Sequence, residues 1–103
     1  MKYGLSENII HKVNSVLEKF SSIEKAIIYG SRAKGNYKKS SDIDIALKGD
    51  IDLQLLSTVI LQIDDLLLPY KFDISVYDHI ANSELLDHIN RVGKTFYQSM
   101  VAQ

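Results

Sequence analysis

The chain has 103 residues, of which 46% are hydrophobic and 24% are charged, as expected for a small globular protein with room for one core. Its formal net charge of -1 gives no general attraction to nucleic acid or to a membrane surface. The absence of cysteine excludes a disulfide framework and a thiolate zinc site, and no apolar run is long enough for a signal peptide or a bilayer span. We therefore expect one cytoplasmic domain over residues 1–103.

The first half of the sequence predicts a helix followed by two strands. Apolar residues recur at spacings of three and four from Leu5 to Phe20 and predict a helix, for which Ser6 is a suitable N-cap. The sequence KAIIYG, residues 25–30, then predicts a short buried strand. The sequence DIDIAL, residues 42–47, alternates strictly between polar and apolar residues and predicts a second strand.

The second half continues this alternation. An apolar stripe predicts a long helix over residues 52–68, which Pro69 would end. The sequence YKFDISVY, residues 70–77, alternates again and predicts a third strand. A last helix should run over residues 83–92, whereas the pattern of residues 94–103 is ambiguous.

The order of these elements indicates the fold class. The predicted order is helix, strand, strand, helix, strand and helix. This order predicts an α+β (two-layer α/β) unit with a small mixed sheet of three to four strands. We expect the helices to pack on one face of the sheet. The other face would then be open to solvent or to a partner.

Three carboxylates interrupt strands that otherwise have the composition of a core. Asp42 and Asp44 project from one face of their strand, whereas Ile43 and Ile45 project from the other. Adjacent anions repel each other, and a bound divalent cation would reverse the sign of that interaction. Asp73 would join them if the second and third strands pair, and such a group could hold two metal ions about 4 Å apart for phosphoryl transfer. The alternative is a solvated strand face with three unrelated acids.

A Gly-Ser turn follows the first predicted strand. Gly30 permits a tight turn, and Ser31 would open a short helix whose free N–H groups and hydroxyl can hold phosphate oxygens. The Walker pattern GxxxxGK[ST] is absent. Tyr29, before the turn, is interpreted as core or as a wall of the site. A lone Gly-Ser pair usually just ends a strand, but here ten residues and then the Asp-x-Asp step follow it.

The spaced pattern of Gly30-Ser31, ten residues and Asp42-x-Asp44 resembles the signature of the DNA polymerase β-like nucleotidyltransferase superfamily. The short length, the GSRAKG form of the turn and the later KFDIS make the chain similar to minimal nucleotidyltransferase (MNT) domains. The motifs cover about residues 26–76, and the order of the predicted elements extends the resemblance to nearly the whole chain. The resemblance implies a single domain with the nucleotidyltransferase fold.

The resemblance also implies a role for each matching residue. Gly30 and Ser31 would hold the β- and γ-phosphates of a nucleoside triphosphate, here expected to be ATP. Asp42 and Asp44 would bind two Mg²⁺ ions, and Asp73 would bind the catalytic ion and help to deprotonate the attacking hydroxyl. The attack on the α-phosphorus would expel pyrophosphate.

Several basic residues lie between the turn and the Asp-x-Asp step. Arg32 and Lys34, which are nearest to the turn, are candidates to neutralise the triphosphate. Lys38 and Lys39 lie farther along, and the alternative for the whole group is a solvated charged loop. The three histidines show no metal-ligand spacing, and we interpret His88 as a structural residue of the last helix.

The chain has no room for the acceptor-binding domain of larger members of the superfamily, so we expect a partner protein to provide the acceptor. MNT proteins are typically encoded beside HEPN-domain proteins, and the resemblance implies an antitoxin that transfers AMP from ATP to a tyrosine hydroxyl of a HEPN toxin. Two alternatives stay open: neutralisation by complex formation alone, and transfer to a small molecule at an acceptor site that a partner supplies. Direct nucleic-acid binding is not expected, and the oligomeric state is open.

Overall fold

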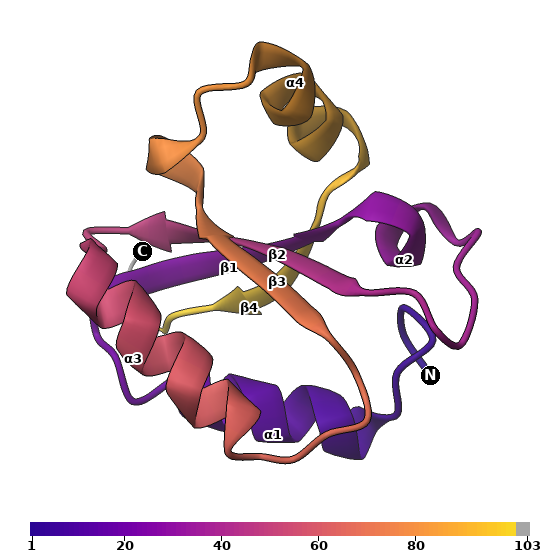
Figure 1. Ribbon diagram of the computed structural model, residues 1–103, viewed down its shortest axis with the longest axis horizontal. Coiled ribbons are helices and arrows are strands. Elements are labelled where there is room, and N and C mark those ends of the chain that lie inside the picture. The colour runs from indigo at the N-terminus through magenta and orange to yellow at the C-terminus, as the bar shows by residue number, and fades with distance from the viewer. Residues whose placement is uncertain (101–103) are drawn as a thin grey trace.

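The computed structural model describes residues 1–100, which form a four-stranded sheet with helices on both of its faces (Figure 1). The elements in chain order are α1 (Glu7–Leu17), β1 (Ile23–Tyr29), α2 (Gly30–Lys34), β2 (Ile43–Gly49), α3 (Leu53–Asp64), β3 (Phe72–Val76), the 3₁₀ turn η1 (Tyr77–His79), α4 (Ser83–Val92) and β4 (Lys94–Gln98). This order confirms the predicted alternation of helices and strands.

The sheet is mixed, with the strand order β3-β2-β1-β4. Strand β1 is antiparallel to both β2 and β4, and β2 is parallel to β3. A parallel pair needs a crossover connection, which α3 provides between β2 and β3. The predicted fold class is therefore confirmed, and the number of strands is four because the ambiguous tail contributes β4.

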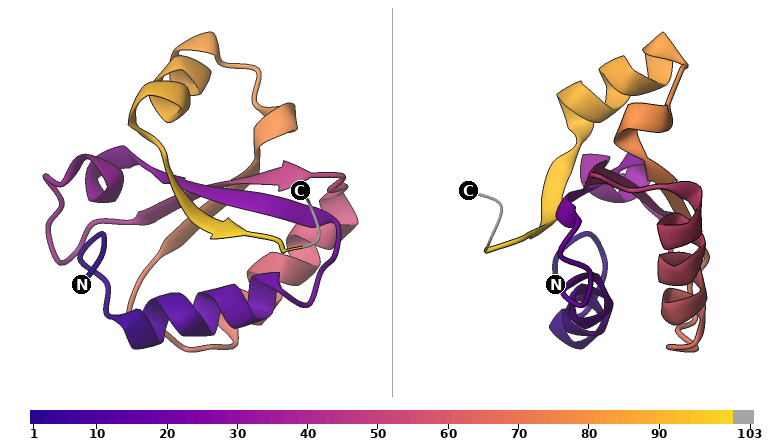
Figure 2. Two further views of the ribbon diagram at one scale, coloured as in Figure 1. Left: turned by 180° about the vertical axis from the view of Figure 1, so that it is seen from behind. Right: turned by 90° about the vertical axis from the view of Figure 1, so that its left-hand side faces the viewer.

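The two faces of the sheet are covered by different helices. Helices α1 and α3 lie on one face, and α4 and η1 lie on the other (Figure 2). On the first face, Ile28, Ile45 and Leu47 belong to the main core. On the second face, Ile89 of α4 packs in a smaller cluster with Ile27, Tyr29 and Ala46. The prediction placed all helices on one face; the structure adds α4 to the face that we expected to be open.

Three of the helices begin at a side-chain cap. The Ser6 hydroxyl accepts a hydrogen bond from the Ile9 N–H at 3.3 Å, which confirms the predicted start of α1. Asp52 caps α3 through the Leu55 N–H, and Asn82 caps α4. Such caps satisfy N–H groups that a helix itself leaves without a partner.

Helix α3 ends at Asp64, four residues before the predicted end at Leu68. After the C-cap Asp65, the Leu66 and Leu67 N–H groups bond three residues back, to Ile63 and Asp64, which closes the last turn. Leu67 then adopts a positive φ of 54°, which no α-helix contains. The apolar periodicity continued past the helix because Leu66 and Leu68 still pack against the main core.

The C-terminal strand completes the sheet at one edge. Phe96 is buried in the main core, whereas Met100 is exposed. Residues 101–103, the end of the segment whose pattern was ambiguous, lie outside the described residues. Within residues 1–100, no helix has both the length and the apolar character needed to cross a membrane.

Candidate active site

Two of the three predicted carboxylates are direct neighbours in the sheet. Asp44 of β2 is paired with Asp73 of β3 in the parallel register. Neighbouring strands lie about 4.8 Å apart, and paired residues project from the same face, so the two carboxylates stand side by side. Asp42 lies immediately before β2 and is close enough to affect the ionisation of Asp44.

The electrostatics of Asp44 reflect this crowding. Partial burial raises the pKa of the Asp44 carboxyl, and the negative charges of Asp73 and then Asp42 raise that pKa further. In the part of the chain that the structure describes, the one ion pair joins Arg91 to Asp87, so no basic side chain pairs with the three acids. Within residues 1–100, no ion pair therefore offsets the charge repulsion among the acids.

These carboxylates fit a hard divalent cation. Carboxylate oxygens are the ligands that Mg²⁺ prefers, and a bound cation would offset the repulsion that raises the Asp44 pKa. As they stand, no group of three or more acidic or histidine side chains among residues 1–100 is arranged to hold a metal ion. In phosphoryl-transfer sites, Mg²⁺ is usually held by one or two carboxylates, with waters and substrate phosphates as its other ligands.

The predicted Gly-Ser turn lies against Asp44. Gly30 has a φ of 73°, a conformation that glycine adopts without strain, and a Cβ atom at this position would collide with the Asp44 Oδ2. Gly30 is also the first residue of α2, and Ser31 follows in the first turn of that helix. The structure thus brings the turn and the carboxylates together at one end of β1 and β2.

His88 belongs to the same site, although the sequence analysis interpreted it as a structural residue of a helix. The Gly30 N–H donates a hydrogen bond to the His88 Nε2 at 3.2 Å. The positive charge of a protonated His88 would also lower the pKa of Asp44. A signal was present in the sequence, because His88 falls three residues after Leu85 and four before Val92 on the apolar stripe of α4.

Tyr29 forms a wall of the site. Its side chain is 6% exposed, and its ring lies edge-on to the His88 ring, with the centroids 6.1 Å apart. The phenol hydrogen-bonds with the Ser75 side chain. Burial raises the pKa of the Tyr29 hydroxyl, and the charges of Asp73 and Asp44 raise it further. Tyr29 therefore stays protonated beside the two carboxylates.

The structure gives Arg32 a role different from the predicted binding of phosphate. The side chain is only 2% exposed, and its guanidinium donates hydrogen bonds to the backbone carbonyls of Tyr3, Lys39 and Ser41 at 3.0 to 3.3 Å. Its Cζ atom lies 5.4 Å from the centroid of the Tyr37 ring and 5.1 Å from that of the Tyr70 ring. A guanidinium held in this way stabilises the loop that leads into Asp42 and is not available to bind a triphosphate.

Lys34 lies elsewhere on the same short helix. It is exposed in the last turn of α2, and within residues 1–100 its side chain makes no hydrogen bond or ion pair. Its ammonium is therefore free to reach a phosphate group near the turn, and its predicted role stays a prediction. Lys38 and Lys39 are exposed on the loop that follows, as in the solvated-loop alternative.

Comparison with known proteins identifies the family of the chain. Residues 11–100 match the polymerase beta nucleotidyltransferase family. The chain belongs to this family. A candidate protein adenylyltransferase from Methanocaldococcus jannaschii is 34% identical to this nucleotidyltransferase over 92 residues, which are 88% of this chain and 85% of the relative.

Solved structures share the fold of this polymerase beta family member. A chain from a toxin–antitoxin complex with AMP-PNP superposes with a TM-score of 0.69 at 21% identity, over 93% of this chain and 76% of that chain. A chain from the complex of an MNT antitoxin with the tri-AMPylated HEPN toxin of Shewanella oneidensis gives 0.67 at 16% identity, over 92% and 74%. A candidate nucleotidyltransferase from Sulfolobus solfataricus gives 0.52 at 17% identity, over 92% and 91%.

Proposed function

We propose that this nucleotidyltransferase transfers AMP from ATP to a tyrosine hydroxyl of a HEPN-class toxin and so acts as its antitoxin. The observation that carries the proposal is the pairing of Asp44 with Asp73 beside the Gly30 turn. Two comparisons support the choice of substrate. One relative is named for protein adenylylation, and solved neighbours of the same fold include an MNT antitoxin bound to a tri-AMPylated HEPN toxin.

In the proposed reaction, each part of the site has a separate role in the displacement at the α-phosphorus. Gly30 and Ser31 bind the β- and γ-phosphates, and Lys34 adds positive charge near them. Asp42, Asp44 and Asp73 would hold Mg²⁺, which would neutralise charge on the phosphate oxygens. The acceptor oxygen forms a bond to the α-phosphorus as the bond from that phosphorus to the bridging oxygen breaks, and pyrophosphate leaves.

Asp73 is suited to receive the proton of the acceptor hydroxyl. Its side chain is exposed, whereas Asp44 beside it is half-buried. An acceptor on another protein can therefore approach Asp73 from solvent, and the carboxylate needs to lie within hydrogen-bond reach of the hydroxyl.

The proposal also covers the domain and its location. Residues 1–103 form one minimal nucleotidyltransferase domain, which acts in the cytoplasm, where ATP and Mg²⁺ are accessible.

Complex formation without catalysis is the second candidate, since the solved neighbours are themselves toxin–antitoxin complexes. The double variant Asp42→Asn/Asp44→Asn separates the two, because it removes metal-binding charge without changing the backbone. The matched control is Asp64→Asn/Asp65→Asn, a pair of exposed acids at the end of α3. We expect transfer of labelled AMP to a co-expressed HEPN partner to fall at least about a hundredfold in the first variant and to be unchanged in the control.

The outcome for neutralisation of the toxin then decides between the candidates. If catalysis is required, the Asp42/Asp44 variant still binds the toxin but no longer neutralises it. If that variant neutralises the toxin fully without transferring nucleotide, complex formation is the mechanism. Transfer to a small molecule in the presence of the partner, with no label on either protein, would instead support the small-molecule alternative.

A further inference from the structure

We propose that His88 is a positioning residue of the nucleotide site, which fixes the Gly30 turn from a helix 58 residues away in sequence. The contact is the hydrogen bond from the Gly30 N–H to the His88 Nε2 at 3.2 Å. It requires the neutral imidazole with its proton on Nδ1, because Nε2 acts as the acceptor. The expected effect of His88 on nucleotide binding rests on the proposed function. The hydrogen bond between His88 and Gly30 can be tested independently of that function.

The Gly30 N–H needs an acceptor from outside its own helix. The first N–H groups of a helix have no partner within that helix, and a side chain at the N-cap usually binds one of them. Ser6, Asp52 and Asn82 do this for α1, α3 and α4. The N-cap of α2 is Tyr29, whose side chain makes no capping hydrogen bond. His88 takes the place of the missing local cap.

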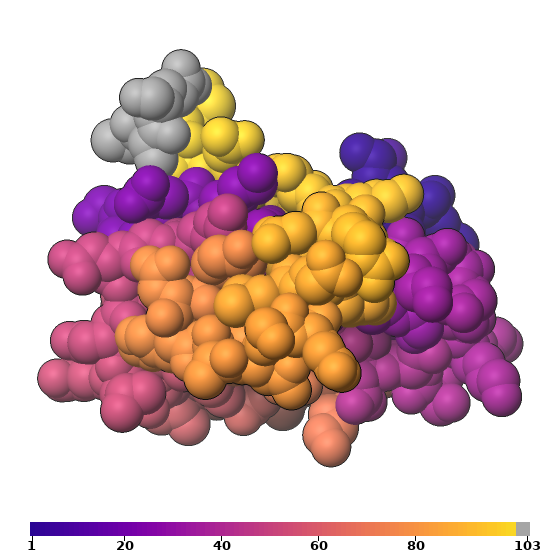
Figure 3. Space-filling model, turned by 90° about the horizontal axis from the view of Figure 1, so that it is seen from above, coloured from indigo at the N-terminus to yellow at the C-terminus, as the bar shows by residue number. Residues whose placement is uncertain are grey.

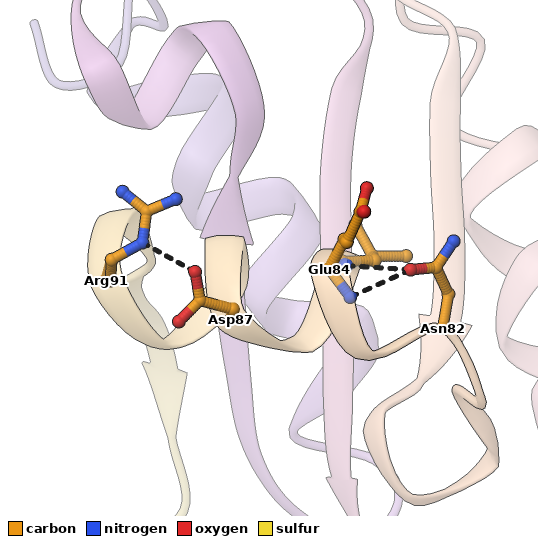
Figure 4. A network of polar contacts seen from close by, with 5 residues as sticks. Asn82, Glu84, Asp87 and Arg91 are labelled. Atoms are coloured by element: carbon orange, nitrogen blue, oxygen red, sulfur yellow. Dashed lines mark hydrogen bonds and ion pairs between the residues drawn. The ribbon is translucent and has the colours of Figure 1, made fainter.

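The His88 ring is held in place by the packing of α4. Ile89, the next residue, is buried against the sheet with Ile27 and Ala46. The His88 ring itself lies in a T-shaped arrangement with the Tyr29 ring. Two other polar contacts belong to the same helix: Asn82 caps its start, and Arg91 forms an ion pair with Asp87 near its end (Figure 4). Neither contact involves the His88 side chain. Helix α4 lies directly beside α2 on this side of the molecule (Figure 3).

The position of the turn matters because Gly30 lies against Asp44. The two residues are so close that a Cβ atom at position 30 would collide with the Asp44 carboxylate. A small rotation of the Gly30 peptide would therefore change the distance between the phosphate-binding turn and the metal-binding acids. His88 limits that rotation, so we expect it to increase the fraction of molecules in which the turn is ready to bind nucleotide.

The test compares two substitutions that differ in their ability to accept a hydrogen bond. His88→Leu keeps an apolar side chain of suitable size against Tyr29 but removes the acceptor, whereas His88→Gln keeps an acceptor oxygen at a similar reach. His11→Leu is the control, since His11 is exposed on α1 at the opposite face of the sheet. We measure hydrogen exchange of the Gly30 amide, the Tm, and the Kd for AMP-PNP with Mg²⁺ by calorimetry.

We expect His88→Leu to exchange the Gly30 amide faster and to bind AMP-PNP about tenfold more weakly, with a Tm close to that of the wild type. His88→Gln should bind within about threefold of the wild type, and His11→Leu should match it. Equal affinities for all variants would overturn the role of His88 and leave the proposed function intact. A His88→Gln variant as weak as His88→Leu would also overturn it, because the loss would then follow packing rather than the acceptor.

Two further outcomes separate this inference from the proposed function. If the wild type binds AMP-PNP but His88→Leu binds more tightly, His88 competes with the nucleotide for the Gly30 N–H, and the positioning role is wrong. If the wild type does not bind AMP-PNP in the presence of Mg²⁺, the proposed function fails, and the nucleotide-site role of His88 fails with it. The exchange rate of the Gly30 amide would still report whether the cap exists.

Discussion

Asp44 and Asp73 are paired across the parallel strands β2 and β3, with no basic side chain of residues 1–100 paired to either of them. Such a pair costs free energy in the absence of a cation, because burial and then the neighbouring charge of Asp73 disfavour the ionised Asp44 carboxyl and raise its pKa. This cost gives the site a signature in protein stability that is independent of catalysis.

The first prediction concerns the pH dependence of stability. Since burial and the neighbouring acids raise the pKa of Asp44 above its usual value of 3.8, the native chain binds this proton more tightly than the unfolded chain. The contribution of Asp44 to the free energy of unfolding is therefore lost as pH rises from 3.8 through the raised pKa. In EDTA, Asp44→Asn should have a higher Tm than the wild type at pH 7, and the difference should shrink toward pH 3.8.

Thermal melts of both proteins across this pH range provide the measurement. Asp64→Asn, a change at an exposed acid on α3, serves as the control and should leave the pH profile of the wild type unchanged. A lower Tm for Asp44→Asn at pH 7 would contradict the account, since it would mean that the charge of Asp44 stabilises the native state without metal.

The second prediction concerns the addition of Mg²⁺. A ligand that binds only the native state raises its stability, by about 1.4 kcal/mol at a free concentration ten times the Kd. We expect Mg²⁺ to raise the Tm of the wild type but not of Asp44→Asn/Asp73→Asn. A monovalent salt at matched ionic strength controls for screening of the carboxylates. Equal shifts in both proteins would show that the effect of Mg²⁺ does not involve these acids.

The third prediction compares the glycines at the two ends of α2, Gly30 as its first residue and Gly35 as its C-cap. Gly30 and Gly35 both have a positive φ, so alanine at either position should cost about 1–2 kcal/mol of backbone strain. Only at Gly30 would the added methyl group meet Asp44, since position 35 has no atom within 4 Å of such a group. Gly30→Ala should abolish AMP-PNP binding, whereas Gly35→Ala should lose stability and keep its affinity, as calorimetry and denaturant melts can measure.

The fourth prediction separates Arg32 from Lys34. Arg32→Lys leaves partly buried carbonyls without donors, because one ammonium cannot reproduce the hydrogen bonds of a planar guanidinium to three carbonyls. We expect a loss of about 3 kcal/mol in the free energy of unfolding. Lys34→Met should change stability by less than about 0.5 kcal/mol and weaken nucleotide binding. Denaturant melts showing equal stability for Arg32→Lys and the wild type would contradict the supporting role of Arg32.

Local patterns in the sequence predicted most of the elements. The start of α1 at Ser6 and the bounds of α4 follow from caps and apolar stripes, which are contained in a few neighbouring residues. The alternation of residues 42–47 predicted the face of Asp44, because a strand has a period of two. The convergence of Asp44 and Asp73 required only that two predicted strands pair, and they do.

The remaining features depend on contacts that no local pattern contains. Arg32 follows the Gly-Ser turn and is a residue type that often binds phosphate, but it is buried by contacts with the N-terminal segment, with the loop before Asp42 and with two tyrosines. His88 approaches Gly30 only because α4 lies on the face of the sheet that we expected to be open. Strand β4 has a single buried side chain, Phe96, so its sequence gave a weak signal.

The most direct test of adenylyl transfer is the intact mass of the partner toxin, co-purified with this chain and incubated with ATP and Mg²⁺. We predict a mass gain equal to one or more AMP groups, located on a tyrosine by fragmentation, and no gain with Asp42→Asn/Asp44→Asn. If the toxin keeps its original mass while the wild-type chain binds both ATP and the toxin, the central claim is contradicted.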